Sequence, residues 1–287
     1  MDYANGIMSY IMGPGLIAQI ILTIVILIIL YSVITIVETV VDAFKKLDRQ
    51  SSILIQNTIT GNEVIVQTPD SGKPLINASE NEPNGMEFSY SLYLFISPET
   101  YEASGTDACD SGGAKKTKLK HIFHKGNSRG FPLLAPGLFT VADKNTLRLY
   151  MNSANKWDNY VEVPNVPVGK WFHLVITLKG RYLDVYINGN VSIRHEFSTV
   201  PKLNYGNVFV MSPSIKFPNG QDKIDVGDYQ IVGPAKGMVS RLKYYAYALN
   251  YSQIDSLYRE GPSKIIDSKS YSEVPPYFHD SWWVSKY

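Results

Sequence analysis

The sequence predicts a mainly β protein: a two-sheet β-sandwich preceded by one N-terminal transmembrane α-helix. An uninterrupted apolar run lies near the N-terminus, and from residue 86 onward short stretches of alternating residues follow one another. In the first of these stretches, every second residue is expected on one face of a strand: Phe88, Tyr90, Leu92, Leu94 and Ile96. The 20 tyrosines favour the same conclusion, because aromatic side chains suit a half-buried pleated surface.

Composition narrows the classes of function. The chain of 287 residues has a formal net charge of +1, which gives no indication of a nucleic-acid partner. Cys109 is the only cysteine, so an intrachain disulfide is excluded and a reducing compartment is modestly favoured. Three N-x-S/T sequons, at Asn77, Asn190 and Asn250, favour the opposite side of a membrane, although sequons also occur by chance.

The apolar run Leu16–Val37 predicts a helix that spans the lipid bilayer. Its 22 residues would form a helix about 33 Å long, which matches a hydrocarbon core of about 30 Å. A signal peptide is the alternative, and it fits less well because neither Lys nor Arg precedes the run. Lys45, Lys46 and Arg49 follow the run, so the positive-inside rule predicts that the C-terminal domain lies on the cytosolic side.

The domain organisation is predicted from changes in periodicity. Residues 38–50 continue the helical pattern as a stalk. Ser52–Thr68 predicts two strands joined as a hairpin at Gly61 and Asn62, and we interpret these strands as the first edge of the sandwich. A short helix is expected at Asn250–Tyr258, capped by Asn250 or Ser252, with Ile254, Leu257 and Tyr258 on one face. The predicted parts are an N-terminal segment (1–15), the transmembrane helix (16–37), the stalk (38–50), a hairpin and linker (51–85), the sandwich (86–261) and an aromatic-rich tail (262–287).

Three stretches resemble one family. Val168–Leu178 (VGKWFHLVITL), a turn at 179–181 and Tyr182–Gly189 (YLDVYING) resemble the central hairpin of concanavalin A-like lectin/glucanase domains, in the laminin G-like branch. Pro136–Val141 with Leu147–Tyr150 resembles the preceding strands, and Gly237–Ile254 resembles the closing strand and short helix. The resemblance implies a jelly-roll of two curved antiparallel sheets.

The residue types in this hairpin also have a physical explanation. Leu183, Val185 and Ile187 alternate, so they are expected to face the core. Asn188 and Gly189 suit the positive φ angles of a tight turn. Trp171 is expected to seal one end of the core.

The sequence predicts that the protein is not an enzyme. The glucanases of this superfamily carry an E-x-D-x-E pattern that places two carboxylates on one face of a strand, and this sequence lacks it. His121 and His124 are expected on opposite faces of a strand, which argues against a shared metal ion. An acidic cluster is expected to be either a solvated loop or a weak calcium site; it comprises Asp222, Asp225 and Asp228. Calcium is the one cofactor that the sequence suggests.

Three groups of residues are candidates for binding. A basic patch is either a solvated segment or a contact for anionic lipid or an acidic partner; it comprises Lys115, Lys116, Lys118 and Lys120. A possible sugar platform comprises Trp157, Asp158 and Tyr160. The tail holds aromatic residues that are expected to pack on their own sandwich or on a neighbouring protein; these are Tyr277, Phe278, Trp282, Trp283 and Tyr287.

Two functions follow. The favoured hypothesis is a non-enzymatic, membrane-anchored structural protein whose sandwich docks a protein layer. In combining a membrane anchor with a laminin G-like domain that lacks disulfides, the sequence resembles membrane-anchored proteins of large DNA viruses. This resemblance implies a minor capsid protein or membrane-to-capsid linker, with its domain between an internal membrane and the capsid. The alternative is a membrane-anchored, lectin-like carbohydrate-binding protein.

Overall fold

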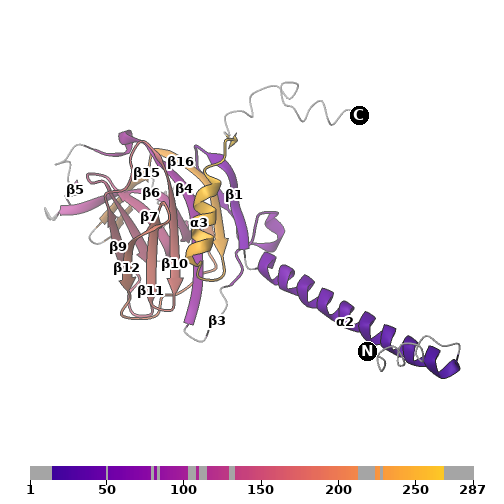
Figure 1. Cartoon of the computed structure of the whole chain (residues 1–287). Helices are drawn as coiled ribbons and strands as arrows, with labels where there is room; N and C mark the ends of the chain where they lie inside the picture. Colours follow the sequence, from indigo (N-terminus) through magenta and orange to yellow (C-terminus); the bar gives the residue numbers. More distant parts are fainter. Residues whose placement is uncertain are drawn as a thin grey trace. The chain divides into compact units, whose positions relative to one another are not determined.

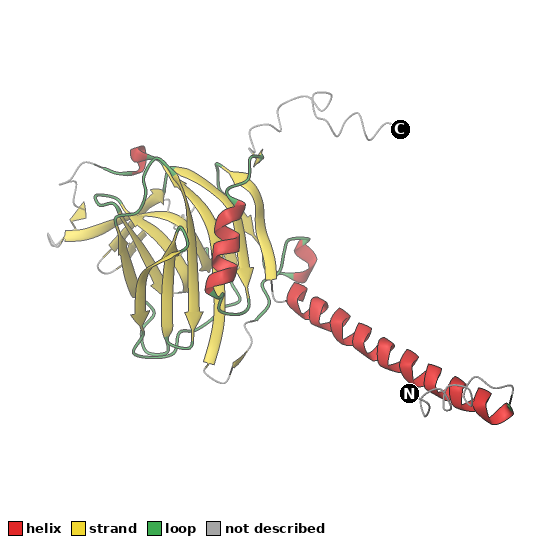
Figure 2. Cartoon of the chain, viewed as in Figure 1, coloured by secondary structure: helices red, strands yellow, loops and turns green. Residues whose placement is uncertain are grey.

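The computed structural model describes residues 15–49, 51–78, 81–82, 85–102, 108–109, 115–128, 133–212, 224–226 and 229–267. The chain divides into two compact units, Met1–Arg49 and Gln50–Tyr287 (Figure 1). The first unit contains one long helix, and the second is built almost entirely from strands (Figure 2).

Helix α2 (Leu16–Arg49) is continuous through the segment predicted as a stalk. Its stretch Gln19–Val41 is long and apolar enough to cross a membrane, a test that an N-terminal signal sequence would also pass. The large apolar side chains of this stretch are exposed in the helical unit. The hydroxyls of Thr23, Ser32 and Thr35 donate to main-chain carbonyl oxygens four residues earlier, so the helix itself satisfies them.

The first sheet, sheet A, has the strand order β12-β11-β10-β4-β16-β1-β17, with β3 beside β4. Neighbouring strands are antiparallel, apart from β17, which pairs parallel to β1. The bounds are β1 (Ser51–Ile59), β3 (Asn81–Glu82), β4 (Gly85–Ile96), β10 (Trp171–Lys179), β11 (Tyr182–Ile187), β12 (Asn190–Glu196), β16 (Gly237–Tyr245) and β17 (Ile266–Asp267).

The second sheet, sheet B, has the order β14-β15-β6-β7-β8-β9. Strand β13 joins it between β6 and β2, and β5 pairs with β6. The bounds are β2 (Glu63–Ile65), β5 (Ala108–Cys109), β6 (Lys115–Gly126), β7 (Leu134–Val141), β8 (Thr146–Met151), β9 (Asn159–Pro164), β13 (Asn207–Val210), β14 (Ile224–Val226) and β15 (Tyr229–Pro234). Two short 3-10 helices, η1 (Pro69–Ser71) and η2 (Pro98–Thr100), lie in connections.

The predicted hairpin at 52–68 is wrong. Strand β1 pairs with β16 in sheet A, whereas β2 pairs with β13 in sheet B. The chain therefore crosses from one sheet to the other at Gly61 and Asn62, which can serve a crossing as well as a tight turn. Both strands nevertheless belong to the sandwich, as expected, so it begins at Ser51 rather than at residue 86, and it extends through β17 to Asp267, beyond the predicted limit of 261.

The core between the sheets confirms the alternation in β4. The residues of β4 predicted to share one face are all fully buried in this core: Phe88, Tyr90, Leu92, Leu94 and Ile96. Side chains of sheet B meet them from the other side, among them Phe123, Leu138, Leu147 and Leu149. The predicted β-sandwich is therefore the observed architecture.

The central hairpin confirms two predictions and corrects a third. Leu183 and Val185 are buried in the core with Ile187 packed against it, and Asn188 and Gly189 have φ angles of 50° and 80°. Trp171 does not seal the core, because its neighbour on β10 takes the inward position and Trp171 faces outward.

Helix α3 (Tyr251–Glu260) lies over the outer face of sheet A (Figure 1). The Asn250 side chain accepts a hydrogen bond from the Gln253 amide (2.9 Å), and the Gln253 side chain accepts one from the Asn250 amide (3.0 Å). This capping box confirms Asn250 as the cap. Ile254 and Leu257 are buried against the sheet, whereas Tyr258, predicted on the same helix face, is 42% exposed.

Candidate functional site

Sheet B carries a second hydrophobic cluster, here the outer cluster, on the face turned away from sheet A. Alternate residues of its strands point into the inter-sheet core, and the residues between them form the outer cluster. The outer cluster comprises Leu119, Leu134, Phe139, Val141, Tyr150, Tyr229 and Ile231, with the half-buried Trp157 packed against it. All seven residues of the outer cluster are buried, whereas Trp157 is half-buried and Tyr160 is exposed, so a binding site on this side of sheet B is expected where these two residues lie.

A band of ring contacts crosses this face from β13 to β9. The distances between ring centroids along it are 4.8 Å for Phe209–His124, 4.9 Å for His124–His121, 5.5 Å for His121–Phe139, 5.6 Å for Phe139–Tyr150 and 5.5 Å for Tyr150–Tyr160. These separations fall in the range that aromatic pairs favour. The band therefore gives the outer face a fixed shape.

Arg148 lies where the band reaches β9. Its guanidinium donates to the Glu162 carboxylate at 2.6 and 3.0 Å and to the Tyr150 hydroxyl at 3.3 Å. The same guanidinium lies 4.4 Å from the ring centroid of Tyr160. Arg148 is 8% exposed and Tyr160 is 47% exposed, so a buried cation supports an aromatic ring that faces solvent.

Tyr229 adds a buried hydroxyl group that has no hydrogen-bond partner among the described residues. Its ring lies 5.0 Å from that of Tyr150. Burial raises the pKa of Tyr229 well above its usual value and raises that of Tyr150 to about 12, so both remain neutral phenols at physiological pH. Tyr229 is only 3% exposed, so its hydroxyl is closed from solvent and belongs to the packing of this face.

The residues of the predicted sugar platform lie near the contact between Arg148 and Tyr160. Tyr160 supplies the exposed ring, and Trp157 packs against the outer cluster. The carboxylate of Asp158 lies 3.6 Å from the ammonium group of Lys156. The structure thus brings the three candidates close to Arg148, and they share one end of the outer face.

The expectation that His121 and His124 face opposite sides is wrong. A β-bulge between His121 and Phe123 adds one residue to β6, so both imidazoles lie on the outer face. The amide of Ser212 donates to Nδ1 of His121 (3.2 Å), which leaves the His121 proton on Nε2, facing Nδ1 of His124 at 2.8 Å. His124 in turn donates from Nε2 to the carbonyl oxygen of Asn127 (2.8 Å).

Each nitrogen in this chain of two imidazoles has a hydrogen-bonding partner when both rings are neutral. Burial, with a smaller effect of His124, lowers the pKa of His121 well below its usual range. Burial also lowers the pKa of His124 to about 4. The pair is therefore a neutral structural element of the band, and its nitrogens are occupied by each other rather than open to a metal ion.

The basic patch is partly neutralised. Glu102 forms ion pairs with Lys118 (3.2 Å) and Lys120 (2.8 Å). The hydrogen bond from Lys120 is the main reason that the pKa of Glu102 is lowered. Lys116 is partly exposed, and the side chain of Lys115 lies outside the described residues.

The remaining candidates are only partly covered by the structure. Within the described residues, no group of three or more His, Cys, Asp or Glu side chains could hold a metal ion. Asp222 and Asp228 lie outside the described residues, as does the side chain of Asp225. The aromatic tail residues also lie outside them: Tyr277, Phe278, Trp282, Trp283 and Tyr287.

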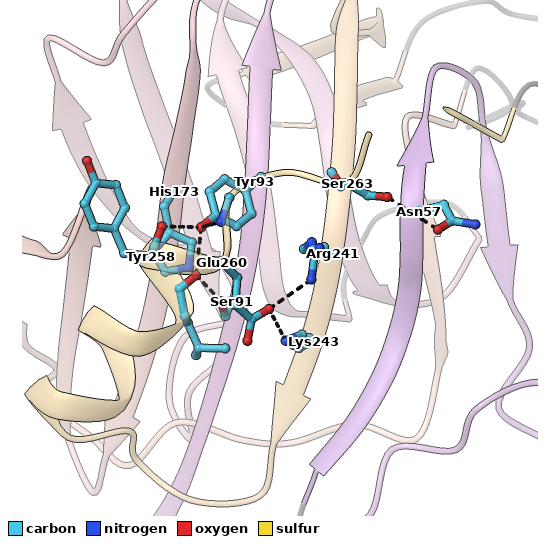
Figure 3. A network of polar contacts seen from close by, with 12 residues as sticks. Asn57, Ser91, Tyr93, His173, Arg241, Lys243, Tyr258, Glu260 and Ser263 are labelled. Atoms are coloured by element: carbon cyan, nitrogen blue, oxygen red, sulfur yellow. Dashed lines mark hydrogen bonds and ion pairs between the residues drawn. The ribbon is translucent and has the colours of Figure 1, made fainter. Parts of the chain in front are cut away.

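A polar network also occurs beneath α3 on sheet A (Figure 3). The Ser91 hydroxyl and Nε2 of His173 are 2.8 Å apart, an arrangement that superficially suits nucleophilic catalysis. Ser91 is 2% exposed and His173 is fully buried, and burial lowers the pKa of His173 to about 4. A pair closed from solvent in this way supports the packing of α3 and is a poor nucleophile for an external substrate.

Comparison with known proteins agrees with this architecture. Residues 70–255 match the Laminin_G_3 family model, described as concanavalin A-like lectin/glucanases superfamily. The chain belongs to this superfamily. A comparison with curated proteins gives no match.

The chain also has a low similarity to several solved structures. The botulinum neurotoxin serotype D ligand binding domain in complex with N-acetylneuraminic acid is 14% identical, with a TM-score of 0.45, over 76% of this chain and 52% of that one. The binding domain of botulinum neurotoxin DC in complex with rat synaptotagmin II is 14% identical, with a TM-score of 0.43, over 73% and 42%. The chain spans about half or less of the length of these structures.

Several residues of the outer face were missed in the sequence. Arg148 and Tyr150 alternate with the core residues of β8, and Glu162 alternates with those of β9. In a concanavalin A-like sandwich, this alternation places all three outward beside Tyr160. Tyr229 could not be assigned, because only its pairing through β15 to β6 brings it to the same face.

Proposed function

We propose that this concanavalin A-like protein is a membrane-anchored, non-enzymatic binding protein. Helix α2 is the anchor and the sandwich is the binding part. The observation that carries the proposal is the apolar stretch Gln19–Val41, whose large apolar side chains are exposed and whose Thr23, Ser32 and Thr35 hydroxyls are satisfied within the helix. Such a surface is costly in water and suited to lipid.

Two observations support a role without catalysis. The sequence lacks the E-x-D-x-E pattern that supplies the acid and the nucleophile in glucanases of this superfamily. The Ser91–His173 pair, the one arrangement in the described residues that resembles a nucleophile with its base, is closed from solvent beneath α3. A role in binding uses the outer faces of the sandwich without requiring either group.

The partner that we propose is a protein layer, such as the coat or capsid of a large DNA virus. In this arrangement the sandwich lies on the cytosolic side, or between an internal membrane and the capsid. Support comes from Lys45, Lys46 and Arg49, which follow the apolar stretch, and from the resemblance to membrane-anchored viral proteins. The full chain should copurify with the shell after the membrane is removed by mild detergent, whereas the separated helix should remain with the detergent.

Topology can be tested with the exposed sequons. Asn77 and Asn190 are both exposed, so a sandwich in the secretory lumen would present them to oligosaccharyltransferase. We expect the full chain, expressed with microsomes, to show no endoglycosidase-sensitive shift and to be digested by added protease. A shift that disappears in Asn77→Gln with Asn190→Gln, together with a protected fragment, would place the sandwich on the other side.

A second candidate function is glycan binding at the outer face of sheet B. It is favoured by the exposed Tyr160 ring above Arg148 and by the half-buried Trp157, which packs against the outer cluster. On a glycan array, Tyr160→Ala should lose retention. Tyr205→Ala, at a tyrosine that is 92% exposed elsewhere, should keep it. Equal retention by both variants would exclude this site.

Calcium can be tested in the same assay. Retention abolished by a chelator would move the glycan site to the acidic segment that contains Asp222, Asp225 and Asp228.

A further inference from the structure

The outer face of sheet A has an apolar patch, here the Trp171 patch, made by Phe95, Trp171 and Met238. The three residues form one row across β10, β4 and β16, because Trp171 is in register with Phe95 and Phe95 with Met238. Their neighbours Phe172 and Val239 belong to the core, so the row faces outward. All three side chains are partly exposed, and the rings of Phe95 and Trp171 are 5.8 Å apart.

Helix α3 covers the sheet beside this patch. Its buried residues Ile254 and Leu257 pack on Val175, four residues further along β10 than Trp171. The end of α3 is fixed by Tyr93, whose hydroxyl lies 2.7 and 2.6 Å from the carbonyl oxygens of Leu257 and Tyr258. α3 therefore has a fixed end and leaves the Trp171 patch partly exposed.

The chain after α3 runs across the outer face of the sheet. The Gly261 amide donates to the Tyr93 hydroxyl (2.9 Å), and the Ser263 amide donates to the Ser240 hydroxyl on β16 (2.9 Å). Thr58 of β1 then donates its hydroxyl to the Ser263 carbonyl oxygen (2.7 Å). Figure 3 shows Ser263 between β16 and Asn57 of β1, so the crossing is held strand by strand.

The described chain ends level with the Trp171 patch. Asp267 of β17 is in register with Ile59 of β1, and Ile59 is in register with Val239 of β16. Val239 adjoins Met238 of the patch. With strands about 4.8 Å apart, Met238 lies roughly 10 Å from β17, and Trp171, two strands further, roughly 19 Å away.

The remaining segment has the length and the composition to cover the patch. Residues 268–287 could extend about 66 Å at about 3.3 Å per residue, several times the distance to Trp171. Its six aromatic residues are Tyr271, Tyr277, Phe278, Trp282, Trp283 and Tyr287. Aromatic side chains are costly to leave in water and gain from ring contacts such as those that Phe95 and Trp171 offer.

We propose that the aromatic segment 268–287 folds back and docks on the Trp171 patch of its own chain. The segment would leave β17 and return across the outer face of sheet A, over β1, β16 and β4, to Trp171 on β10. This inference does not depend on the proposed function, because it concerns an intramolecular contact that would be present with or without a membrane or a partner.

Thiol protection in the full chain tests the proposal. The reporter is Met238→Cys in a Cys109→Ser background, reconstituted in lipid nanodiscs, and its alkylation rate is compared with that of the same chain ending at Asp267. We expect at least a tenfold faster reaction in the shortened chain. Tyr205→Cys, on the side of sheet B, is the matched control and should react equally in both lengths.

Equal rates at the two lengths for Met238→Cys would overturn the proposal. Should Met238→Cys fail to fold, Lys170→Cys, at the exposed neighbour of Trp171, replaces it with the same expectation.

Oxidative cross-linking identifies the occupant. With Met238→Cys and Phe278→Cys together, we expect a disulfide within one chain, seen as a faster-migrating monomer that reduction reverses. A disulfide-linked dimer would instead assign the patch to the tail of a second copy, and would overturn docking within one chain. A Tyr205→Cys and Phe278→Cys pair should form the bond much more slowly.

Discussion

Acidification should destabilise the sandwich through its buried histidines. A proton added to His124 would enter at Nδ1, where it would point at the Nε2 proton of His121 only 2.8 Å away. Because the pKa of His124 is about 4 in the folded chain and about 6.5 when unfolded, the unfolded chain binds a proton first as pH falls. The stabilisation is complete above pH 6.5 and is lost between pH 6.5 and about 4.

The magnitude follows from these two pKa values. The difference of about 2.5 units corresponds to about 3 kcal/mol when pH is below 4, and to about 2 kcal/mol at pH 5. His173, whose pKa is also lowered to about 4 by burial, adds a similar loss. Because domains are stable by only about 5–15 kcal/mol, the sandwich should approach unfolding near pH 4.5.

The assay is urea denaturation of the full chain in detergent at pH 7.5 and pH 5, followed by near-ultraviolet circular dichroism. His124→Gln removes one titrating group, so it should reduce the difference in unfolding free energy between the two pH values by about 2 kcal/mol. His195→Gln, on the exposed edge strand β12, is the matched control. The reasoning is refuted if His124→Gln retains the full pH dependence of the natural chain.

Three further substitutions test polar contacts, each by urea denaturation or hydrogen exchange. Lys125→Met should cost about 1–3 kcal/mol, because the buried ammonium donates to carbonyl oxygens of the segment 204–206 that would lose their partner. A cost below 0.5 kcal/mol would contradict this. Tyr93→Phe should cost about 1–2 kcal/mol and raise amide exchange at Gly261, with unchanged exchange as the contrary result. Asn250→Ala should cost about 1 kcal/mol by removing the cap of α3, and an unchanged unfolding midpoint would exclude a role for the cap.

Local periodicity was sufficient for much of the fold. In β4 the residues at every second position are all buried, because strand geometry alone sends alternate side chains to opposite faces. The turn at Asn188 and Gly189 was predictable for a similar reason, since few residues adopt its positive φ angles. The pairing of β1 with β16 was not, because it joins segments about 180 residues apart in the chain and no local pattern encodes the partner.

The candidate site was only partly predictable, for a different reason. Tyr160 and Trp157 could be proposed from residue type, whereas the partner groups Tyr150 and Tyr229 belong to strands β8 and β15 that meet only through β6 and β7. Residue type therefore indicated a surface aromatic, and the tertiary fold made it part of a site.

Two bulges decide which side chains share the outer faces. The bulge in β6 places His121 and His124 on one face of sheet B. In β16, a register shift at Arg241, whose φ is 50°, turns two successive residues, Ser240 and Arg241, outward on sheet A. Ser240 then holds the chain after α3, and Arg241 forms an ion pair with Glu260 at the end of that helix. A regular strand would have sent one of the two inward. The two bulges, rather than the alternating core pattern, therefore allow sheet A to hold the chain that follows α3 and bring both imidazoles into the ring contacts of sheet B.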